Sequence, residues 1–189
     1  MGFISSNHLA PAGGSFEPQR SYNFSLEIAL DDAGDQMLIM SGLESFDTPT
    51  ETTEEIVLDY GSSKRYVAGK TTFNTAELKL KDFVDQGVAQ AVINWRRSVF
   101  NAETDATGFA RDYKKSADLI LVAPDNSISR IWKLQGLWPT TVHYGSLSMA
   151  QSDKVLISVT LRYDRALPGS NLSLGLAGIN AGALTSPIT

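Results

Sequence analysis

The amino-acid sequence predicts a mostly β domain of the α+β class, with about seven strands and one helix. Apolar and polar residues alternate with a period of two over residues 22–30 and again over residues 155–163, which is typical of half-buried strands. Only one stretch, Val84 to Val99, has apolar residues at spacings of three and four, which predicts a helix. The sequence therefore predicts strands on both sides of one central helix.

The first half of the chain predicts a hairpin and two further strands. DDAGD at residues 31–35 supplies turn residues after the first strand, so Met37–Leu43 is predicted to return as its partner strand. Alternation then predicts strands around Ile56–Tyr60 and Ala76–Leu80, joined by a basic loop that contains glycine.

The second half predicts the helix, a loop, a second hairpin and a closing strand. Asp82 is available to cap the helix, and the polar stretch Asn101–Lys115 predicts an exposed loop. Ala117–Val122 and Ile128–Leu137 predict a hairpin around the turn PDNS at residues 124–127. Residues 155–163 then predict the final strand.

The two ends differ from the middle, so the chain is predicted to consist of an extension at 1–20, one domain at 21–166 and an extension at 167–189. The first 20 residues lack the basic start and apolar middle of a signal peptide. Residues 167–189 contain no charged residue, and Leu172, Leu174 and Leu176 have a spacing of two. This pattern fits a strand added to another subunit, and it fits a loose tail equally well.

The composition excludes several classes of function. The 189 residues include no Cys, which excludes disulfides, thiolate zinc sites and thiol catalysis. The net charge is −5, with 16 Lys and Arg against 21 Asp and Glu, which argues against a surface that grips nucleic-acid phosphates. No run of about 18 apolar residues is present, so no membrane anchor is predicted.

Two motifs resemble parts of known functional sites, but each lacks residues that such a site needs. His143 is a candidate for the histidine of a Ser-His-Asp triad, but no Gly-x-Ser-x-Gly turn accompanies it, so an exposed loop histidine is the preferred interpretation. Gly69, Lys70 and Thr71 end like a P-loop, but Lys64 stands where the motif needs glycine and a strand follows instead of a helix. That segment is therefore predicted to be a turn.

The sequence predicts neither a pair of catalytic carboxylates nor a metal-binding site. Glu54 and Glu55 are adjacent on a predicted strand, so they point to opposite faces and cannot share a substrate. Histidines are too few and the acids too scattered for a metal cluster. The sequence therefore predicts no enzyme, no cofactor and no metal.

Charge is distributed unevenly along the chain. Six acids and no base lie between Glu44 and Tyr60, and Lys64, Arg65 and Lys70 follow without an acid. Opposite charges on neighbouring segments suit a self-complementary head-to-tail stack, although an ordinary solvated face also explains them.

Several stretches together resemble one known family. They are SGLESFDTPTETTEEIVLDY at Ser41–Tyr60, YVAGKTTFNTAELKLKD at Tyr66–Asp82, the helix end at Trp95, Arg96 and Arg97, and GLWPTTV at Gly136–Val142, which follows the hairpin segment LILVAPDNSISRIWKL. In this order, over roughly residues 20–165, the chain resembles the tube protein of contractile phage tails of the T4-like myophages, which is shared with pyocins.

The resemblance implies a fold and a function. It implies a two-sheet antiparallel β-sandwich or barrel with one flanking α-helix, closing into a continuous β-barrel in a hexameric ring. Rings would stack into the inner tube of a contractile tail, through which DNA is ejected across the host envelope without specific binding. The implied partners are other copies of the chain, the tail sheath protein, and the baseplate and tail terminator proteins. The implied location is the virion, after assembly in the bacterial host cytoplasm.

The resemblance also gives roles to charged residues. The lumen-lining candidates are Glu51, Glu54, Glu55 and Asp59. The candidates for contacts between rings or subunits are Lys64, Arg65 and Lys70. The sheath-facing candidates are Arg96, Arg97, Arg111, Lys114 and Lys115. Trp138 and Pro139 are interpreted as structural, a buried ring followed by a rigid strand exit.

Three alternatives remain open. The first is a tube of a related machine, namely a pyocin, an extracellular contractile injection system or a type VI secretion system. The second, of another class, is a monomeric ligand-binding β-barrel with a closed apolar pocket. The third is an esterase-like enzyme that depends on His143. A fibre protein is disfavoured because the sequence has no repeats.

Overall fold

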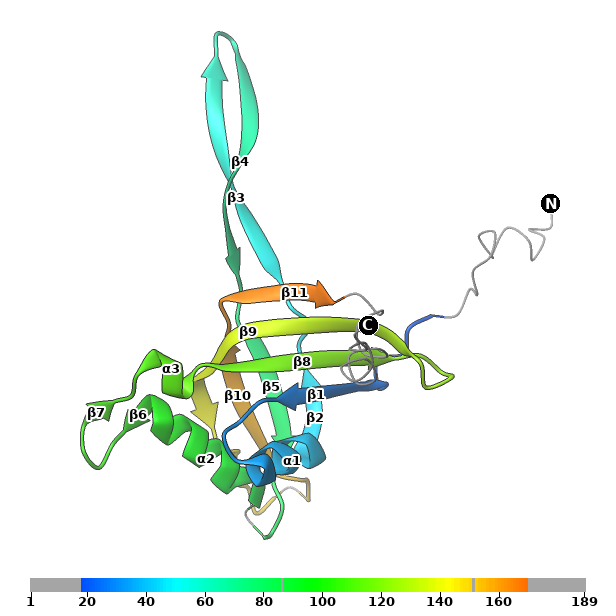
Figure 1. Cartoon of the computed structure of the whole chain (residues 1–189), viewed down its shortest axis with the longest axis vertical. Coiled ribbons are helices and arrows are strands. Elements are labelled where there is room, and N and C mark those ends of the chain that lie inside the picture. The colour runs from blue at the N-terminus through cyan, green and yellow to red at the C-terminus, as the bar shows by residue number, and fades with distance from the viewer. Residues whose placement is uncertain (1–17, 86, 151, 170–189) are drawn as a thin grey trace, which may run out of the picture.

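The computed structural model describes residues 18–85, 87–150 and 152–169 (Figure 1). Most of the described chain forms antiparallel strands, with three helices between them. The mostly β class with some helix is therefore confirmed. The alternating leucines Leu172, Leu174 and Leu176 lie outside the described residues, and so does His8, the second of the two histidines in the sequence.

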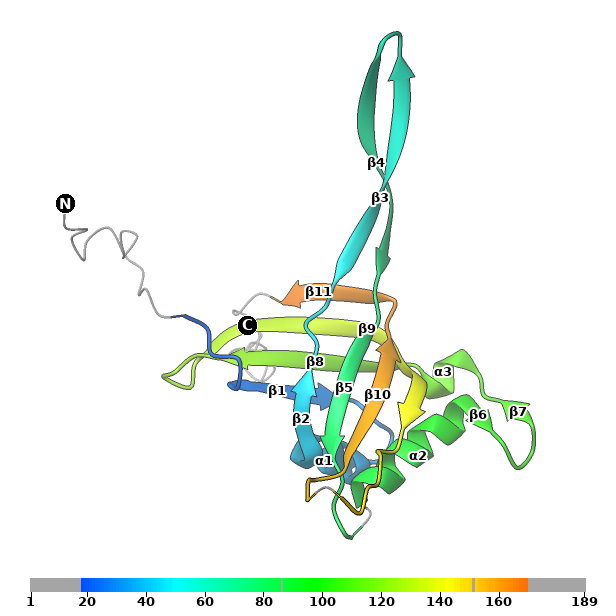
Figure 2. The ribbon, with the colours of Figure 1, turned by 180° about the vertical axis from the view of Figure 1, so that it is seen from behind.

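Two layers of strands enclose one core. The first layer contains β1 (Phe24–Ile28), β8 (Lys115–Val122), the first part of β9 (Ile128–His143) and β11 (Arg165–Gly169). The second layer contains β2 (Leu43–Phe46), β5 (Ala76–Lys81), β10 (Leu156–Arg162) and the second part of β9. Neighbouring strands are antiparallel throughout, and the strands of the two layers run in crossing directions (Figures 1 and 2).

Strand β9 connects the layers by bending at a glycine. Residues 128–137 pair with β8, whereas residues 138–143 pair with β10. Gly136 has a φ of +69°, and a Cβ atom there would come within 2.2 Å of the Asp164 carboxylate. Because only glycine adopts this conformation freely, Gly136 permits the bend. The strand continues to His143, so the predicted strand exit at Pro139 is wrong; Pro139 is buried, and the half-buried Trp138 packs against Tyr113.

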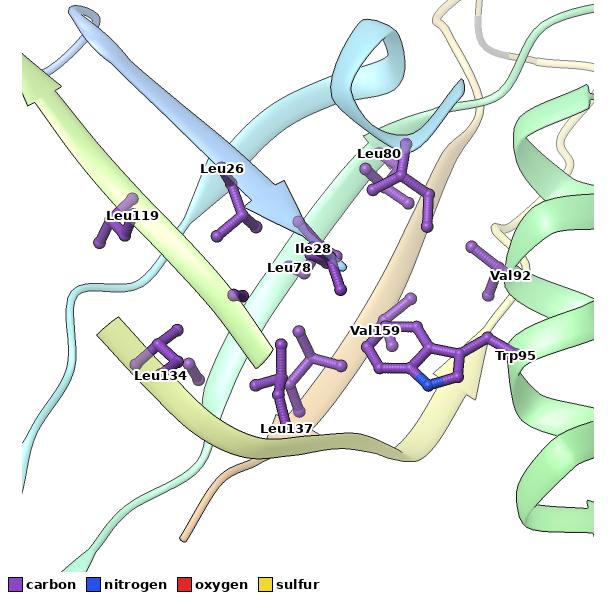
Figure 3. Packing of buried hydrophobic residues seen from close by; sticks show 14 of the residues in the cluster. Leu26, Ile28, Leu78, Leu80, Val92, Trp95, Leu119, Leu134, Leu137 and Val159 are labelled. Atoms are coloured by element: carbon purple, nitrogen blue, oxygen red, sulfur yellow. The ribbon is translucent and has the colours of Figure 1, made fainter. Parts of the chain in front are cut away.

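The core lies between the two layers and one helix (Figure 3). Leu26 and Leu119 come from the first layer, Leu78 and Val159 come from the second, and Trp95 comes from α2 (Gly87–Val99). Each of these side chains is at most 4% exposed. Burial of one large apolar side chain contributes roughly 1.5–3 kcal/mol, so this cluster is the main source of stability.

The predicted central helix is confirmed as α2. Its buried residues Val88, Val92, Trp95 and Val99 have the predicted helical spacing. The helix begins at Gly87, not at Val84, and the Asp85 carboxylate accepts a hydrogen bond of 3.3 Å from the Gly87 N–H. The predicted cap by Asp82 is therefore wrong.

Two further helices replace predicted strand and loop. Residues 33–42 form α1 (Ala33–Gly42), so the predicted strand at Met37–Leu43 is wrong for all but its last residue. The Asp32 carboxylate caps α1 by accepting a hydrogen bond of 2.7 Å from the Gly34 N–H. The predicted loop at residues 101–115 contains a short helix, α3 (Ala110–Tyr113), and the small hairpin of β6 (Phe100–Asn101) and β7 (Ala106–Thr107).

A long hairpin projects from the layers (Figures 1 and 2). It consists of β3 (Glu51–Tyr60) and β4 (Ser63–Phe73), paired along their whole length, and we call it the arm. The segment predicted as a basic loop, Lys64–Lys70, is therefore part of a strand. The predicted turn at Gly69–Thr71 is wrong for the same reason.

The two layers do not close on themselves. Over the described residues, β1 and β11 are the free edges of the first layer, and β2 is a free edge of the second. The described chain is therefore an open two-layer structure with no closed barrel.

Candidate assembly surfaces

One face of the arm is an exposed apolar stripe. Alternation along β3 puts Ile56, Leu58 and Tyr60 on this face, and the register adds Val67 opposite Ile56 and Arg65 opposite Leu58. Ile56 and Leu58 are 49% and 48% exposed and Tyr60 is 68% exposed. The Arg65 guanidinium lies 4.7 Å from the centre of the Tyr60 ring, a cation–π distance. No residue of β3 is buried, so none of the described residues covers the apolar stripe.

The other face of the arm carries most of the lumen-lining candidates. Glu51, Glu55 and Asp59 share this face of β3 by alternation, and Glu54 belongs to the apolar side. Lys64 stands directly opposite Asp59 in the register. The structure therefore brings three of the four candidate acids together on one face, which they share with the exposed apolar pair Val57 and Tyr66.

A bulge explains the glycine that resembled part of a P-loop. Between Thr53 and Glu55 the register of β4 shifts by one residue, at Gly69 and Lys70. A Cβ atom at Gly69 would lie 3.0 Å from the Glu54 carbonyl oxygen, so the glycine permits the close approach of the two strands. Gly69 is thus a strand residue and belongs to no phosphate loop.

The five sheath-facing candidates lie near the ends of α2 and α3, but their environments differ. Arg97 and Arg111 are 57% and 80% exposed, and each pairs with a nearby acid. Lys114 and Lys115 bind the carboxylates of Asp164 and Asp31, and the Lys115 side chain is only 9% exposed. Arg96 is half-buried, with one guanidinium nitrogen that lacks a hydrogen-bond partner within the described residues. Exposure therefore favours Arg97 and Arg111 for contact with another protein.

His143 lies at the end of β9 and is exposed. Its Nδ1 atom accepts a hydrogen bond of 3.2 Å from the Gly145 N–H, which is a contact within a turn. A triad needs this ring to be held beside a nucleophile, and a turn contact does not do so.

The structure adds two features that sequence reasoning missed. The first is the free edge of β1. The Val122 N–H donates a hydrogen bond to the Asn23 carbonyl oxygen, and the Ala29 N–H donates one to the Ser116 carbonyl oxygen. In the segment 23–29, the backbone N–H and C=O groups of the odd-numbered residues therefore point toward β8. The backbone groups of Phe24 and Leu26 therefore point toward the open edge.

The second missed feature is a pair of acids on the outer face of the first layer. Glu27 and Asp118 are direct cross-strand partners, and Lys133 stands opposite Asp118 on the other side. Like charges opposite each other destabilise a sheet, so this pair favours a role outside folding. The period-two pattern of residues 22–30 and 117–122 was the signal that could have identified it.

A groove runs between the free edges of β1 and β2, with a volume of about 580 Å³. Tyr22, Phe24, Phe46 and Leu121 are among its lining residues. The groove is open at the surface, unlike the closed pocket expected of a ligand-binding barrel.

Within the described residues, no three His, Asp or Glu side chains are placed together so that they could hold a metal ion. Among the helices of residues 18–85, 87–150 and 152–169, none is both long enough and apolar enough to cross a membrane.

An open β fold with an exposed apolar arm is typical of a structural subunit, because a large exposed apolar surface marks a site of contact with another protein. The sequence model of the family described as T4-like virus tail tube protein gp19 matches residues 20–166, so the chain belongs to this family. The predicted resemblance is therefore confirmed. The chain is a structural tube subunit of a contractile tail, and thus part of a virion tail or of a related particle.

Relatives agree with this assignment. A tail tube protein of Serratia phage KSP90 is 24% identical over 122 residues, which cover 64% of this chain and 69% of the relative.

Two solved structures share the fold. A chain in the cryo-EM structure of the anti-feeding prophage cap has a TM-score of 0.65 at 15% identity, covering 83% of this chain and 94% of that one. A chain in the PVC sheath-tube complex, an extracellular contractile injection system in the extended state, has a TM-score of 0.60 at 16% identity, covering 89% and 99%.

Proposed function

We propose that six copies of the chain form a ring, and that rings stack into the inner tube of a contractile phage tail, the conduit for DNA ejection across the host envelope. The proposal rests on one observation, the combination of an exposed apolar arm with two free edges in one layer. Other copies of the chain would cover both the apolar surface and the free edges.

The free edges fit ring closure. Strands alternate in direction across the first layer, so β1 and β11, at its two edges, run in opposite directions. The β11 edge of one copy placed beside the β1 edge of the next would therefore continue the antiparallel pattern. Repeated around a ring, this pairing leaves no free edge in the layer and closes a continuous barrel.

The negative charge of the chain agrees with a channel through which DNA passes without adhering to the wall. A ring of six copies, each with a net charge of −5, carries −30. We assign the acidic face of the arm, Glu51, Glu55 and Asp59, to the lumen, and keep Glu54 as a weaker candidate because it lies on the opposite face. The outer face of the first layer, with Glu27 and Asp118, would add to the same wall. Carboxylates repel phosphates and release no counterions on contact with DNA.

The basic residues are candidates for contacts with other proteins of the tail. Lys64, Arg65 and Lys70 on β4 are candidates for contacts between rings or subunits. Arg96, Arg97, Arg111, Lys114 and Lys115 are candidates for contact with the tail sheath protein, with Arg97 and Arg111 the most accessible. The baseplate and tail terminator proteins are the expected partners at the two ends of the tube.

The phage tail is favoured over other contractile machines by sequence. The family that matches is a phage family, and the relative with 24% identity is a phage tail tube protein. The shared fold of injection-system chains keeps the pyocin and the other injection tubes as the alternative. A phage tail subunit would be assembled in the cytoplasm of the bacterial host before release in the virion.

Electron microscopy of the purified chain tests the proposal. The expected result is six-fold rings or hollow rods, with a monomer fraction that decreases as protein concentration rises. A chain that remains monomeric at high concentration, and that is missing from tail tubes of the particles in lysates, would contradict the proposal and favour a monomeric binding protein.

A further inference from the structure

The groove between β1 and β2 continues along the free edge of β1. The groove itself is lined mainly by residues 19–22, which precede β1, and by residues 44–48. A smaller pocket of about 250 Å³ adjoins it and is lined by residues of β1, α1 and β2. The two hollows share Tyr22, Phe24 and Glu44. A chain that follows the β1 edge would therefore pass from the pocket directly into the groove.

The charged residues of the groove already have partners. Glu44 forms ion pairs with two lysines, and the Asp47 carboxylate accepts a hydrogen bond of 3.0 Å from the Glu77 N–H. The Arg20 guanidinium donates a hydrogen bond of 3.2 Å to the Tyr22 hydroxyl group. Burial of a further charge beside these pairs would be costly, so the groove favours an apolar and uncharged occupant.

The two walls of the groove are held in place by the rest of the chain. The Gln19 side-chain amide donates a hydrogen bond of 3.0 Å to the Val122 carbonyl oxygen at the end of β8. On the other wall, the Asp47 N–H donates a hydrogen bond of 3.1 Å to the Glu77 carbonyl oxygen. An occupant would therefore enter a surface that is already ordered, which lowers the entropic cost of binding.

The end of β11 would bring an uncharged segment to this groove in a neighbouring copy. Ring closure places β11 antiparallel to β1 of the next copy, so Gly169, the last residue of β11, lies beside the start of that β1. Residues 170–189 contain no charged residue, and the leucines at 172, 174 and 176 share one face of an extended chain. The first of them comes three residues after Gly169, or about 10 Å in an extended chain. That distance reaches the residues that precede β1, which line the groove.

The same segment is farther from the groove of its own chain. One row of register partners crosses the first layer, from Gly169 through Ile131 and Ile120 to Ser25. Three strand spacings, about 14 Å, therefore separate Gly169 from β1 within the chain. The segment would have to cross a face of the layer, and Leu172 would lie over that face and not in the groove.

We propose that residues 170–176 of one copy continue β11 as an added strand and lie in the groove between β1 and β2 of the adjacent copy in the ring. The three leucines pack on the apolar wall of the groove, which contains Phe24, Phe46 and Leu121. Backbone groups of the segment pair with those ahead of β1, as in other cases of strand addition. This inference rests on the proposed function, because ring closure brings the segment to the groove.

The absence of cysteine in the sequence permits a clean cross-linking test. Ser173→Cys labels the segment without removing a leucine, and Ser45→Cys labels the groove at an exposed lining residue. Thr104→Cys is the matched control, because Thr104 is exposed and lies in the turn between β6 and β7, far from the start of β1 (Figures 1 and 2). A short bis-maleimide is the cross-linker, and thermal melting checks that each variant is folded.

The proposal predicts a cross-link between copies. A mixture of Ser173→Cys and Ser45→Cys chains should give about ten times more cross-linked dimer than a mixture of Ser173→Cys and Thr104→Cys chains, because docking raises the effective concentration of the two thiols. The double variant should give a ladder of species that ends at a closed ring. Each single variant alone should give no more dimer than Thr104→Cys alone.

Serine substitutions test the role of the leucines. In the Ser173→Cys chain, replacement of the three alternating leucines by serine should lower the dimer yield about tenfold, because it removes the apolar contact with the groove. The matched control carries Ile179→Ser, Leu184→Ser and Ile188→Ser, which remove as many apolar side chains from the same extension. Its dimer yield should stay within about twofold of that of the Ser173→Cys chain.

Four results would overturn the proposal. A double variant that cross-links within single chains, without a ladder, would place the segment in the groove of its own chain. A cross-link from Ile4→Cys to Ser45→Cys in place of Ser173→Cys would assign the groove to the N-terminal extension. An equal loss of dimer in both serine variants would exclude recognition of the alternating leucines. Rings or tubes without the dimer would place the segment elsewhere.

Electron microscopy of the same samples separates these results from failure of the proposed function. Rings or tubes in the micrographs show that the tube function stands even where the cross-link is missing. Samples with neither rings nor cross-linked dimers would contradict the proposed function together with this inference.

Discussion

Glu44, on β2, links the loop between β5 and α2 to the loop between β9 and β10 through its ion pairs with Lys81 and Lys154. Hydrogen bonds from Lys154 and then from Lys81 lower the pKa of its carboxyl group below the ordinary value of 4.5. The carboxylate is thus favoured in the folded state, because both ammonium groups stabilise its charged form. The two lysines stand at the bases of two loops that are far apart in sequence, so one side chain holds both.

This lowered pKa predicts a pH-dependent contribution to stability. A carboxyl group whose pKa is lower in the folded state stabilises the protein above its unfolded pKa, and this stabilisation is lost as the pH falls through the folded value. Glu44→Gln is therefore expected to lower Tm at pH 7, where both ion pairs are complete. The difference in Tm from the unaltered chain should shrink below pH 4.5 and vanish at lower pH. Calorimetry from pH 7 to pH 2 measures it.

Lys154→Gln is the matched control for this prediction, because it removes the larger of the two causes and leaves Lys81 in place. It should show the same trend with a smaller pH dependence than Glu44→Gln. A difference in Tm that stays constant from pH 7 to pH 2 would contradict a role for the Glu44 charge.

At the scale of elements, the strands that bury one face were predictable, whereas of the exposed or short strands only the second half of β3 was, because Ile56, Leu58 and Tyr60 alternate along it. The segment of β10 and that of α2 showed clear periods because one face of each packs on the core. The strand β4 showed no such period, because Lys64, Arg65, Gly69 and Lys70 interrupt its apolar residues. Hydrophobic periodicity reports that one face of a strand is apolar, whether or not that face is buried within the chain, so the exposed strand β3 gave a signal and β4 did not.

The helix α1 was mistaken for a strand for a different reason. Its four consecutive apolar residues, Met37 to Met40, fit a short strand as well as a helix, and only Ile39 and Gly42 are buried. The distinguishing signal was the cap. Asp32 was interpreted as a turn residue, while its carboxylate accepts the hydrogen bond that begins the helix.

The arm is expected to be dispensable for folding and necessary for assembly. Thr52 and Thr72 are register partners near its base, so residues 53–71 can be replaced by a two-residue Asn-Gly turn. The replaced residues include no buried side chain, so the free energy of unfolding should change by less than about 1 kcal/mol. Chemical unfolding measures this value, and sedimentation should show monomers or single rings where the full chain forms tubes.

A point variant tests the role of the arm in assembly without shortening it. Leu58→Asp leaves the arm in place and puts a charge into the apolar stripe, so it should weaken stacking with an unchanged melting temperature. Tubes of normal length in both variants would show that the arm has no part in assembly. A strongly destabilised shortened chain would show instead that the arm supports the core.

At the scale of the whole molecule, the class of protein could be predicted from the sequence, but the surfaces that it uses in assembly could not. The resemblance predicted the family from four stretches, and the period of β1 and β10 predicted which of their residues share a face. Which of those faces meets solvent, DNA or another copy depends on contacts between chains. The free edges at β1 and β11 became visible only when the strand order was known.

Contacts between copies of the chain would create the wall of the channel. Variants that replace its acids by lysine test which residues form this wall. One variant carries Glu51→Lys, Glu55→Lys and Asp59→Lys on the arm, and a second carries Glu27→Lys and Asp118→Lys on the first layer. A third, with Glu103→Lys and Asp112→Lys near α2 and α3, reverses charge on the side assigned to the sheath. Lysines in the lumen would bind phosphates, so tubes of the first two variants should retain DNA, and the retention should fall as salt rises.

Nuclease protection distinguishes the lumen from the outside of the tube. DNA held in the lumen is shielded from nuclease, whereas DNA bound to the outer surface is digested. We therefore expect protected DNA with the first and second variants, and none with the third or with the unaltered chain. Protection by the layer variant alone would move the lumen wall from the arm to the first layer. Protection by neither variant would contradict an acidic lumen, because reversal of charge on a wall in contact with DNA must change its affinity for phosphate.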